Sequence, residues 1–297
     1  MKLSLFSVSY AGLWGQQRLD LPSFIGRAAE LGFEGVMLMG KRPHLSPLDV
    51  GAETLASLRA ALKQHGIQCA VLAGYTDLSG AGAAEVPYLE MQIAYVEALA
   101  HLARQLDARI VRLFTAYEID GQSPQTVWDR VVRVLREICD RAAACDVTIA
   151  VQNHHDTAVH SEALLELLGD VARPNCKLGF DAWSPGLRGE NLYEAARRLA
   201  PHTAITTNAD YVRLPRFRYR PEVVNYERAQ PDLVRAVRFG EGCIDYRAFF
   251  QGLRDGGFDG WASYEMCSPI RGGGGAENLD ASARHYLQWM RENVLRA

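Results

Sequence analysis

A cluster of polar side chains directly follows a short apolar segment in the middle of the chain. Residues Val147–Val151 are apolar or β-branched, as expected for a strand that is covered on both faces. Alternate side chains of a strand point to opposite faces, so Gln152 and His154, which come next, are expected to share one face. An imidazole titrates near neutral pH, which makes His154 a candidate base for removing a proton next to a carbonyl group.

Two carboxylates stand at the ends of other apolar segments. Asp181 follows Lys177–Phe180, and Glu265 follows Gly260–Tyr264. Amide and carboxylate oxygens suit a hard divalent cation such as Mn²⁺ or Mg²⁺, so Gln152, Asp181 and Glu265 are candidate metal ligands if their strands converge. Each carboxylate also has a structural explanation, because Asp181 can cap the following turn and Glu265 can pair with a lysine or an arginine.

The order of apolar and amphipathic segments predicts that these strands converge. Expected strands alternate with expected helices, which is typical of a (β/α)₈ TIM barrel, here a single domain over residues 1–297. In such barrels the active site forms at the carboxyl ends of the strands. An open doubly wound sheet is the alternative, but no Gly-x-Gly-x-x-Gly follows the first strand. The expected strands are 3–8, 36–39, 67–75, 109–114, 147–151, 177–181, 203–207 and 260–265, and the expected helices are 20–31, 52–64, 85–106, 124–144, 161–168, 191–199, 246–255 and 276–295.

A long insertion, residues 211–242, interrupts the alternation after the seventh expected strand. Its first ten residues, 211–220, mix aromatic side chains with four arginines, of which Arg216 is one. Guanidinium groups suit carboxylates, phosphates or sugar hydroxyls, so the insertion is one candidate for substrate binding. The alternative is an arm that packs on a neighbouring subunit in a homo-oligomer.

Further residues near the expected strand ends are candidates for substrate binding. Aromatic side chains offer surfaces on which a sugar ring can stack, and imidazole or guanidinium groups offer hydrogen-bond donors. Ordinary packing at the rim of the barrel, or a place in a surface turn, is the alternative for each of them. The candidates are Trp14, His44, His155, Trp183, Arg188 and Arg216.

Composition excludes several classes of function. The formal net charge of −3 gives no electrostatic basis for binding nucleic acid or an anionic membrane. No apolar run approaches the ~20 residues that span a bilayer, and the first residues do not read as a signal peptide. The six cysteines form no Cys-x-x-Cys pair, so reduced thiols in a cytoplasmic protein are expected. We therefore expect a small-molecule ligand.

Several phrases of the sequence resemble the xylose isomerase-like TIM barrels, a large group of sugar isomerases and epimerases. In these proteins a divalent metal is held by Glu, Asp, His and Glu at the ends of strands five to eight, and the two Glu residues commonly transfer the proton. The resemblance covers nearly the whole chain. It rests on Ala28–Val36, the segment around Gln152, Phe180-Asp181, Gly240–Asp245 and Tyr264-Glu265.

The sequence departs from that family pattern at two positions. Gln152 replaces the glutamate of strand five, and an amide cannot act as a base. Thr207-Asn-Ala-Asp210 replaces the His-x-Lys-Asp phrase of strand seven, so Asn208 can serve as a ligand only if a bulge shifts the strand. The resemblance then implies a weakened Mn²⁺ or Mg²⁺ site made by Gln152, Asp181, Asn208 and Glu265.

Three functions follow as hypotheses. The first is a sugar or keto-sugar isomerase or epimerase in which His154 moves the proton, while Glu265 binds the metal or acts as the counterpart of His154. The second is a lyase, either a dehydratase or an enzyme that cleaves C-glycosides or 3-keto-glycosides. The third is a sugar-binding barrel that has lost catalysis. Apurinic endonuclease activity, also found in this family, is disfavoured because it requires a histidine-rich zinc cluster.

Overall fold

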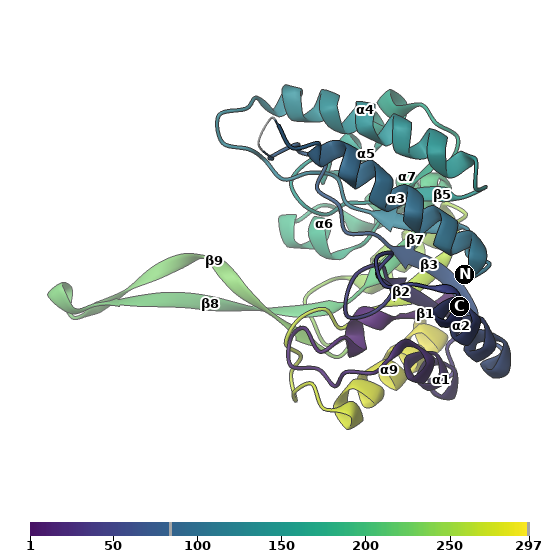
Figure 1. Ribbon diagram of the computed structural model, residues 1–297. Helices are drawn as coiled ribbons and strands as arrows, with labels where there is room; N and C mark the ends of the chain where they lie inside the picture. Colours follow the sequence, from purple (N-terminus) through teal and green to yellow (C-terminus); the bar gives the residue numbers. More distant parts are fainter. Residues whose placement is uncertain (83–84, 296–297) are drawn as a thin grey trace.

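Eight parallel strands form the centre of the computed structural model, which describes residues 1–82 and 85–295 (Figure 1). Most of their residues are buried, because one face of each strand points into the barrel and the other packs against helices. The strands are β1 (Lys2–Phe6), β2 (Gly35–Met39), β3 (Gln68–Ala73), β4 (Ile110–Leu113), β5 (Thr148–Gln152), β6 (Cys176–Gly179), β7 (Thr203–Asn208) and β10 (Trp261–Tyr264).

The strands close into a barrel in the order β1-β10-β7-β6-β5-β4-β3-β2. Strand β1 pairs in parallel with both β10 and β2, which closes the cylinder. The predicted (β/α)₈ barrel is therefore confirmed. Strand β6 ends two residues before the expected end at Asp181, because the backbone N–H of Asp181 donates to the side chain of Asn153 instead of to a neighbouring strand.

Helices surround the barrel on its outer side (Figure 1). Helix α1 illustrates how the sequence sets their ends. The side chain of Asp20 accepts the backbone N–H of Ser23 at the start of the helix, and Gly32 takes the left-handed conformation at its end, with φ of 96°. The helices are α1 (Leu21–Leu31), α2 (Ala52–His65), α3 (Tyr88–Gln105), α4 (Pro124–Ala143), α5 (Ser161–Val171), α6 (Trp183–Arg188), α7 (Leu192–Leu199), α8 (Tyr246–Asp255) and α9 (Ala276–Met290), with short helical turns at Ser7–Tyr10, Ala200–His202, Pro221–Val223 and Arg291–Leu295.

Two apolar cores lie on the two faces of the strands. The larger core fills the space between the strands and the helices. The smaller core fills the barrel interior, and its members alternate along the strands with residues of the larger core. This alternation determines which polar side chains can enter the barrel mouth. The buried members of the inner core are Phe6, Val8, Ala11, Met37, Met39, Ala70, Val71, Ala73, Ala150 and Ile205.

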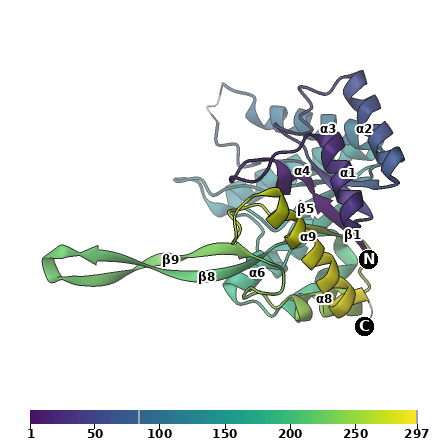
Figure 2. The ribbon, with the colours of Figure 1, turned by 90° about the horizontal axis from the view of Figure 1, so that it is seen from below.

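A long antiparallel hairpin follows β7 and corresponds to most of the expected insertion. It consists of β8 (Asp210–Arg220) and β9 (Asn225–Val237). Its base is buried, but residues from Arg213 to the turn are mostly exposed. Both views show the hairpin extending away from the barrel and its helices (Figures 1 and 2). Sequence composition predicted a polar insertion here without indicating a pair of strands.

In the part of the chain that the structure describes, no helix combines the length and the apolar character needed to cross a bilayer.

Candidate active site

A cavity of about 190 Å³ lies at the carboxyl ends of β5, β6, β7 and β10. Gln152 lies two residues after the inner-core residue Ala150, and Thr207 lies two residues after Ile205, so both side chains point inward. The volume is below the roughly 300–1,000 Å³ of pockets for drug-sized ligands, which indicates a small substrate. The lining residues are Gln152, His154, Asp181, Trp183, Thr207, Ala209, Tyr211, Val234, Glu265, Cys267 and Ser268.

Gln152 is the centre of a hydrogen-bonded group within this cavity. Its Nε2 donates to Asp181 Oδ2 at 2.8 Å and to Thr207 Oγ1 at 2.9 Å, while its Oε1 has no protein partner among the described residues. The other oxygen of Asp181 accepts the backbone N–H groups of Trp183 and Ser184. Burial raises the pKa of Asp181 to about 6, although these hydrogen bonds act in the opposite direction.

The donor set of this group does not fit a resident divalent metal. The two N–H groups of the Gln152 amide donate hydrogen bonds to Asp181 Oδ2 and Thr207 Oγ1. The amide hydrogens therefore lie where a cation would have to lie in order to contact both oxygens. Turning the amide would place its oxygen against the carboxylate of Asp181. Among the described residues, no group of three or more His, Cys, Asp or Glu side chains could hold a metal ion. In the structure, two of the predicted ligands, Gln152 and Asp181, are hydrogen-bonded to each other.

Asn208 does not take part in this cluster. No bulge shifts the end of β7, and the side chain of Asn208 points toward the helices, where its Nδ2 donates to the Ser263 backbone oxygen at 3.2 Å and to Tyr286 Oη at 3.5 Å. The ligand role predicted for Asn208 is corrected accordingly. The inward position belongs to Thr207, which presents a neutral hydroxyl group.

Glu265 faces the cavity from the end of β10. Withdrawal from bulk water raises the pKa of Glu265 to about 7 against the opposing positive charge of Arg112, and the negative charge of Asp181 contributes to this increase. The side chain of Glu265 also contacts the thiol of Cys267. A carboxylate with a pKa near neutrality is suited to take and return a proton at physiological pH. This finding supports the predicted proton-transfer role of Glu265.

Arg112 lies inside the barrel below the cavity and was not predicted. Its side chain is 2% exposed; Nη1 donates to the Gly74 backbone oxygen at 2.9 Å, whereas Nε has no partner among the described residues. The guanidinium carbon lies 4.3 Å from the ring centre of Phe114 and 5.2 Å from that of Tyr75. The alternation of Ile110, Arg112 and Phe114 could have indicated an inward-facing cation.

His154 lines the cavity but differs from the predicted base. Burial, together with the neighbouring His155 and Arg112, lowers the pKa of His154 to about 4, so the ring is neutral at physiological pH. Its Nδ1 accepts the backbone N–H of His155 at 2.8 Å. The proton of the neutral ring is therefore assigned to Nε2. In this state His154 donates a hydrogen bond more readily than it accepts a proton.

The predicted substrate-binding residues do not all lie at the cavity. Trp183 lines the cavity and its buried Nε1 lacks a partner among the described residues. His155 lies next to the cavity, stacked on Tyr117 with 3.9 Å between ring centres. His44 is bonded to Ser7 and to the backbone of Leu19, away from the cavity.

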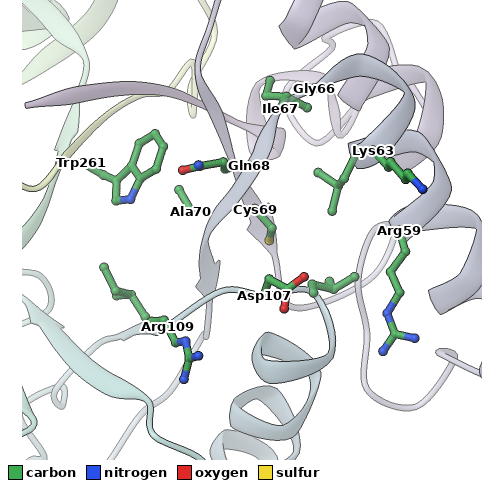
Figure 3. A pocket seen from close by; sticks show the side chains of 13 residues that line it. Arg59, Lys63, Gly66, Ile67, Gln68, Cys69, Ala70, Asp107, Arg109 and Trp261 are labelled. Atoms are coloured by element: carbon green, nitrogen blue, oxygen red, sulfur yellow. The ribbon is translucent and has the colours of Figure 1, made fainter.

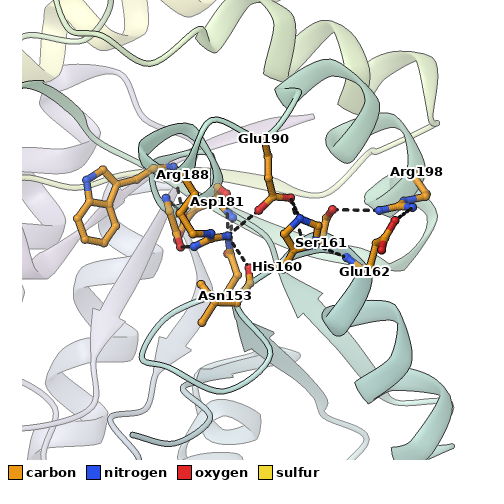
Figure 4. A network of polar contacts seen from close by, with 11 residues as sticks. Asn153, His160, Ser161, Glu162, Asp181, Arg188, Glu190 and Arg198 are labelled. Carbon is orange, nitrogen blue, oxygen red and sulfur yellow. Dashed lines mark hydrogen bonds and ion pairs between the residues drawn. The ribbon is translucent and has the colours of Figure 1, made fainter. Parts of the chain in front are cut away.

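The remaining three predicted binding residues also lie outside the cavity. Trp14 is 40% exposed in the loop after β1, and Arg216 lies on the hairpin, where it donates to the Pro231 backbone oxygen. Arg188 is part of a polar network that joins α6 to the start of α5 through Glu190 (Figure 4). These bonds connect Arg188 to Ser184, Val159 and Glu190 and hold the segment after Asp181 in place.

A larger hollow of about 710 Å³ lies at the opposite end of the barrel, where β3 and β4 begin (Figure 3). Side chains such as Arg59, Lys63 and Asp107 surround it. In TIM barrels this end supports stability, whereas active sites occupy the other end. The smaller cavity around Gln152 is therefore the candidate active site.

Comparison with known protein families agrees with the barrel fold and with the polar side chains at the carboxyl ends of its strands. The chain belongs to the xylose isomerase-like TIM barrel family, whose model matches residues 25–293. This match confirms the resemblance that the sequence phrases indicate. The family contains epimerases and dehydratases among the relatives of this chain.

Two curated proteins illustrate this range of activities. The chain is 26% identical over 271 residues to a 3-dehydroshikimate dehydratase of Bacillus anthracis, covering 89% of this chain and 90% of that protein. It is 19% identical over 265 residues to a fructoselysine 3-epimerase of Shigella flexneri, covering 85% of this chain and 87% of the relative.

Solved structures confirm the fold. A probable 3-DHS dehydratase from Bacillus anthracis superposes with a TM-score of 0.75 at 22% identity, covering 98% of this chain and 99% of the other. A D-psicose 3-epimerase structure determined in the presence of D-fructose also gives a TM-score of 0.75, at 16% identity and 99% coverage of both chains.

Proposed function

We propose that the protein is a lyase that removes water from a small cyclic carbohydrate or polyol carrying a ketone. The observation that carries the proposal is the amide of Gln152, which stands where the second proton-transferring carboxylate of the family pattern would lie and is bonded to Asp181 and Thr207. Glu265 then remains as the cavity carboxylate suited to proton transfer. The lyase, which was the second hypothesis drawn from the sequence, is therefore preferred to the isomerase or epimerase.

Stereochemistry explains why one base favours elimination. An epimerase inverts a carbon centre, so the proton leaves from one face and a proton must arrive on the other, which requires a proton donor on each side. An amide such as Gln152 supplies no proton for this step. Elimination needs only one face, because the base that takes the α-proton can deliver it to the departing hydroxyl group on the same side.

The proposed steps use residues of this chain alone. The Glu265 carboxylate takes the proton from the carbon next to the ketone, and the electrons of the C–H bond move onto the carbonyl oxygen to give an enolate. The enolate then expels the β-hydroxyl group, which receives the proton from Glu265 and leaves as water. Glu265 is returned to its carboxylate form, and the product contains a double bond conjugated to the ketone.

His154 is proposed to stabilise the enolate. Its Nε2–H is a neutral donor. His154 follows the end of β5, which lies three strands from β10 around the barrel, so His154 and Glu265 approach the cavity from different sides. A hydrogen bond aimed at an oxygen that gains charge in the transition state contributes about 3–4 kcal/mol. The charge of Arg112 below the cavity favours the same negative charge.

Unpartnered polar atoms around the cavity support a polyol substrate. Gln152 Oε1, Trp183 Nε1 and Ser268 Oγ are buried and lack partners among the described residues. Buried polar groups normally have hydrogen-bond partners, and the hydroxyl groups of a bound substrate would supply them. The 3-dehydroshikimate dehydratase among the relatives acts on a small ring of this kind, which agrees with the size of the cavity.

Product analysis tests the proposal. The purified protein is incubated in deuterated water with 3-dehydroshikimate and, separately, with a 3-keto-glucoside, and the products are followed by ultraviolet absorbance and mass spectrometry. Elimination gives a product that has lost one water and absorbs as a conjugated system. A product of unchanged mass apart from incorporated deuterium, with inverted configuration, would instead establish the epimerase alternative, which the similarity to 3-epimerases favours.

Two variants assign the roles within the site. Glu265→Gln is expected to lose turnover, because an amide cannot take the α-proton. His154→Phe is expected to lower kcat about 10²–10³-fold, whereas His154→Gln, which keeps a donor, retains more activity. Equal losses in both His154 variants would contradict the donor role.

A further inference from the structure

Three aromatic rings share one face of the hairpin of β8 and β9 with Arg228, and this face is called the aromatic face. Phe217 is paired with Arg228, and Tyr219 with Tyr226, so the three rings lie on the same face. The ring centres of Tyr219 and Tyr226 are 5.2 Å apart. The opposite face carries the charged pair Arg218 and Glu227. Such alternation is typical of a sheet that covers an apolar surface with one side.

The aromatic face is uncovered within this chain. Phe217 is 60% exposed, Tyr226 is 66% exposed, and Val224 at the turn is 77% exposed. The hairpin extends away from the barrel in both views (Figures 1 and 2). An isolated two-stranded hairpin is at best marginally stable in water, so a partner surface is needed to fix its conformation. Exposed apolar groups of this kind mark interaction sites.

A surface of complementary chemistry lies on the same end of the barrel. The loops after β4 and β5 surround a hollow of about 230 Å³ with apolar walls that include Val127 and Trp128. Three acidic residues, Glu118, Asp120 and Asp156, stand at this hollow and are exposed. The hollow therefore offers an apolar surface for an aromatic side chain and negative charge for arginines.

The charges of the two surfaces are opposite. Residues 212–235 of the hairpin contain six arginines and three acidic residues, which gives a formal charge of +3. Since the whole chain carries −3, the remainder carries −6. Two copies of the chain therefore attract one another when the hairpin of each meets the body of the other.

We propose that the hairpin is a dimerisation arm that lies on the acidic hollow of a second copy. The arm emerges after β7 and the hollow follows β4 and β5, on different sides of the same barrel end, so two facing copies can exchange arms reciprocally about a two-fold axis. Nine residues, 212–220, span about 30 Å at ~3.3 Å each, which is enough to cross the mouth of a neighbouring barrel.

The area available suffices for a stable dimer. An aromatic side chain buries about 150–250 Å², and the three rings of each arm are roughly half to two-thirds exposed, so six rings lose roughly 700 Å² on arm exchange. The surface that they cover loses a similar area. The total of about 1,400 Å² lies within the range of about 1,200–2,000 Å² for specific interfaces.

Light scattering coupled to size-exclusion chromatography tests this proposal on the full chain. The wild-type protein is expected to elute as a dimer, and the double substitution Phe217→Ser with Tyr226→Ser is expected to elute as a folded monomer with the circular dichroism of the barrel. Leu48→Ser is the matched control, because Leu48 is 85% exposed on a different loop, and it retains the dimer.

A second substitution tests the place where the arm binds. Asp120→Lys reverses one charge at the hollow and is expected to weaken the dimer at least tenfold at low salt, with a smaller effect at high salt. A monomeric wild-type protein, or a double variant that dimerises as the wild type does, overturns the proposal. A dimer that Asp120→Lys leaves unchanged overturns the assignment of the hollow.

Discussion

At the scale of single residues, Gln152 has the greatest consequence for chemistry. In the family pattern a carboxylate at this position contributes negative charge to a metal site, whereas Gln152 contributes two hydrogen-bond donors to Asp181 and Thr207. The change from acceptor to donor joins Gln152 to Asp181 and Thr207 and leaves Gln152 Oε1 without a protein partner among the described residues. The site therefore depends on hydrogen bonds and on the buried charge of Arg112.

We predict that the wild-type protein gains no thermal stability from Mn²⁺, whereas the double variant Gln152→Glu, Thr207→His does. The two substitutions add a carboxylate and an imidazole to Asp181 and Glu265, which completes a set of oxygen and nitrogen ligands. A ligand at a hundredfold excess over its Kd stabilises the folded state by about 2.7 kcal/mol. Differential scanning fluorimetry, with and without Mn²⁺, measures the effect.

The control for this prediction is a triple variant that also carries Asp181→Asn. Removing this carboxylate should abolish the gain from Mn²⁺, because it deletes an inward-facing ligand of the designed site. Isothermal titration calorimetry provides an independent measurement. Stoichiometric binding of Mn²⁺ to the wild-type protein would show that the donor set described above does accept a metal.

Much of the site could be predicted from residue types, but not its protonation states. The ends of apolar runs identify Gln152, Asp181 and Glu265 correctly as neighbours, because parallel strands bring their carboxyl ends together. Whether His154 accepts or donates depends on the backbone N–H of His155 beside its Nδ1. Such a contact has no signature in the sequence.

At the scale of elements, the inward and outward alternation of each strand selects the side chains of the site. The alternation places Thr207 in the cavity and Asn208 against Tyr286. Comparison with the family's strand-seven phrase alone did not show which of these two residues faces the cavity. The alternation also places Arg112 inside the barrel. The repeating order of strands and helices predicts the barrel well, whereas the hairpin was missed because its exposed strands lack the apolar pattern of a buried strand.

The base of the hairpin is fixed by Asp210. Its carboxylate accepts the backbone N–H groups of Tyr211, Gly240 and Gly242, each at 2.9 Å. A Cβ atom at Gly242 would lie 1.9 Å from Asp210 Oδ1, so only glycine fits there. Since Tyr211 and Val234 line the cavity, this anchor also positions one wall of the candidate active site.

We predict that Asp210→Ala lowers the free energy of unfolding by roughly 3 kcal/mol, because three buried or half-buried N–H groups lose a charged acceptor. Urea denaturation followed by circular dichroism measures the change. Asp232→Ala is the control, since it removes only the exposed ion pair with Arg228 on the arm, which contributes less than about 1 kcal/mol. Equal effects of the two substitutions would contradict the anchoring role of Asp210.

At the scale of the whole molecule, the two ends of the barrel have separate tasks. The end with the larger hollow of Figure 3 carries exposed charged residues, whereas the other end carries the cavity, the arm and the acidic hollow. The candidate active site at this second end contains two carboxylates, Asp181 and Glu265. Their raised pKa values require that the folded protein binds protons more tightly than the unfolded chain does.

For Asp181 and Glu265, the contribution to the free energy of unfolding is predicted to fall between pH 5 and pH 8, whereas the lowered pKa of His154 acts in the opposite direction up to about pH 6.5. The pKa of Asp181 is raised to about 6 and that of Glu265 to about 7, so the stability that their protonation contributes is complete below the ordinary carboxyl range and is lost as the pH rises through those values. Glu265→Gln removes the larger part of this loss. The shift of Glu265 from 4.5 to about 7 corresponds to about 3 kcal/mol.

Chemical denaturation of the wild type and of Glu265→Gln at pH 5 and pH 8 measures the difference. The variant is expected to be the more stable of the two at pH 8, while the two proteins converge at pH 5, where the wild-type carboxyl group is already protonated. Glu53→Gln, an exposed position in the first turn of α2, is the control and should leave the pH dependence unchanged. A difference in stability between the two proteins that is the same at pH 5 and at pH 8 would show that the pKa of Glu265 is not raised in the folded state, and its assignment as a base with a neutral pKa would then fail.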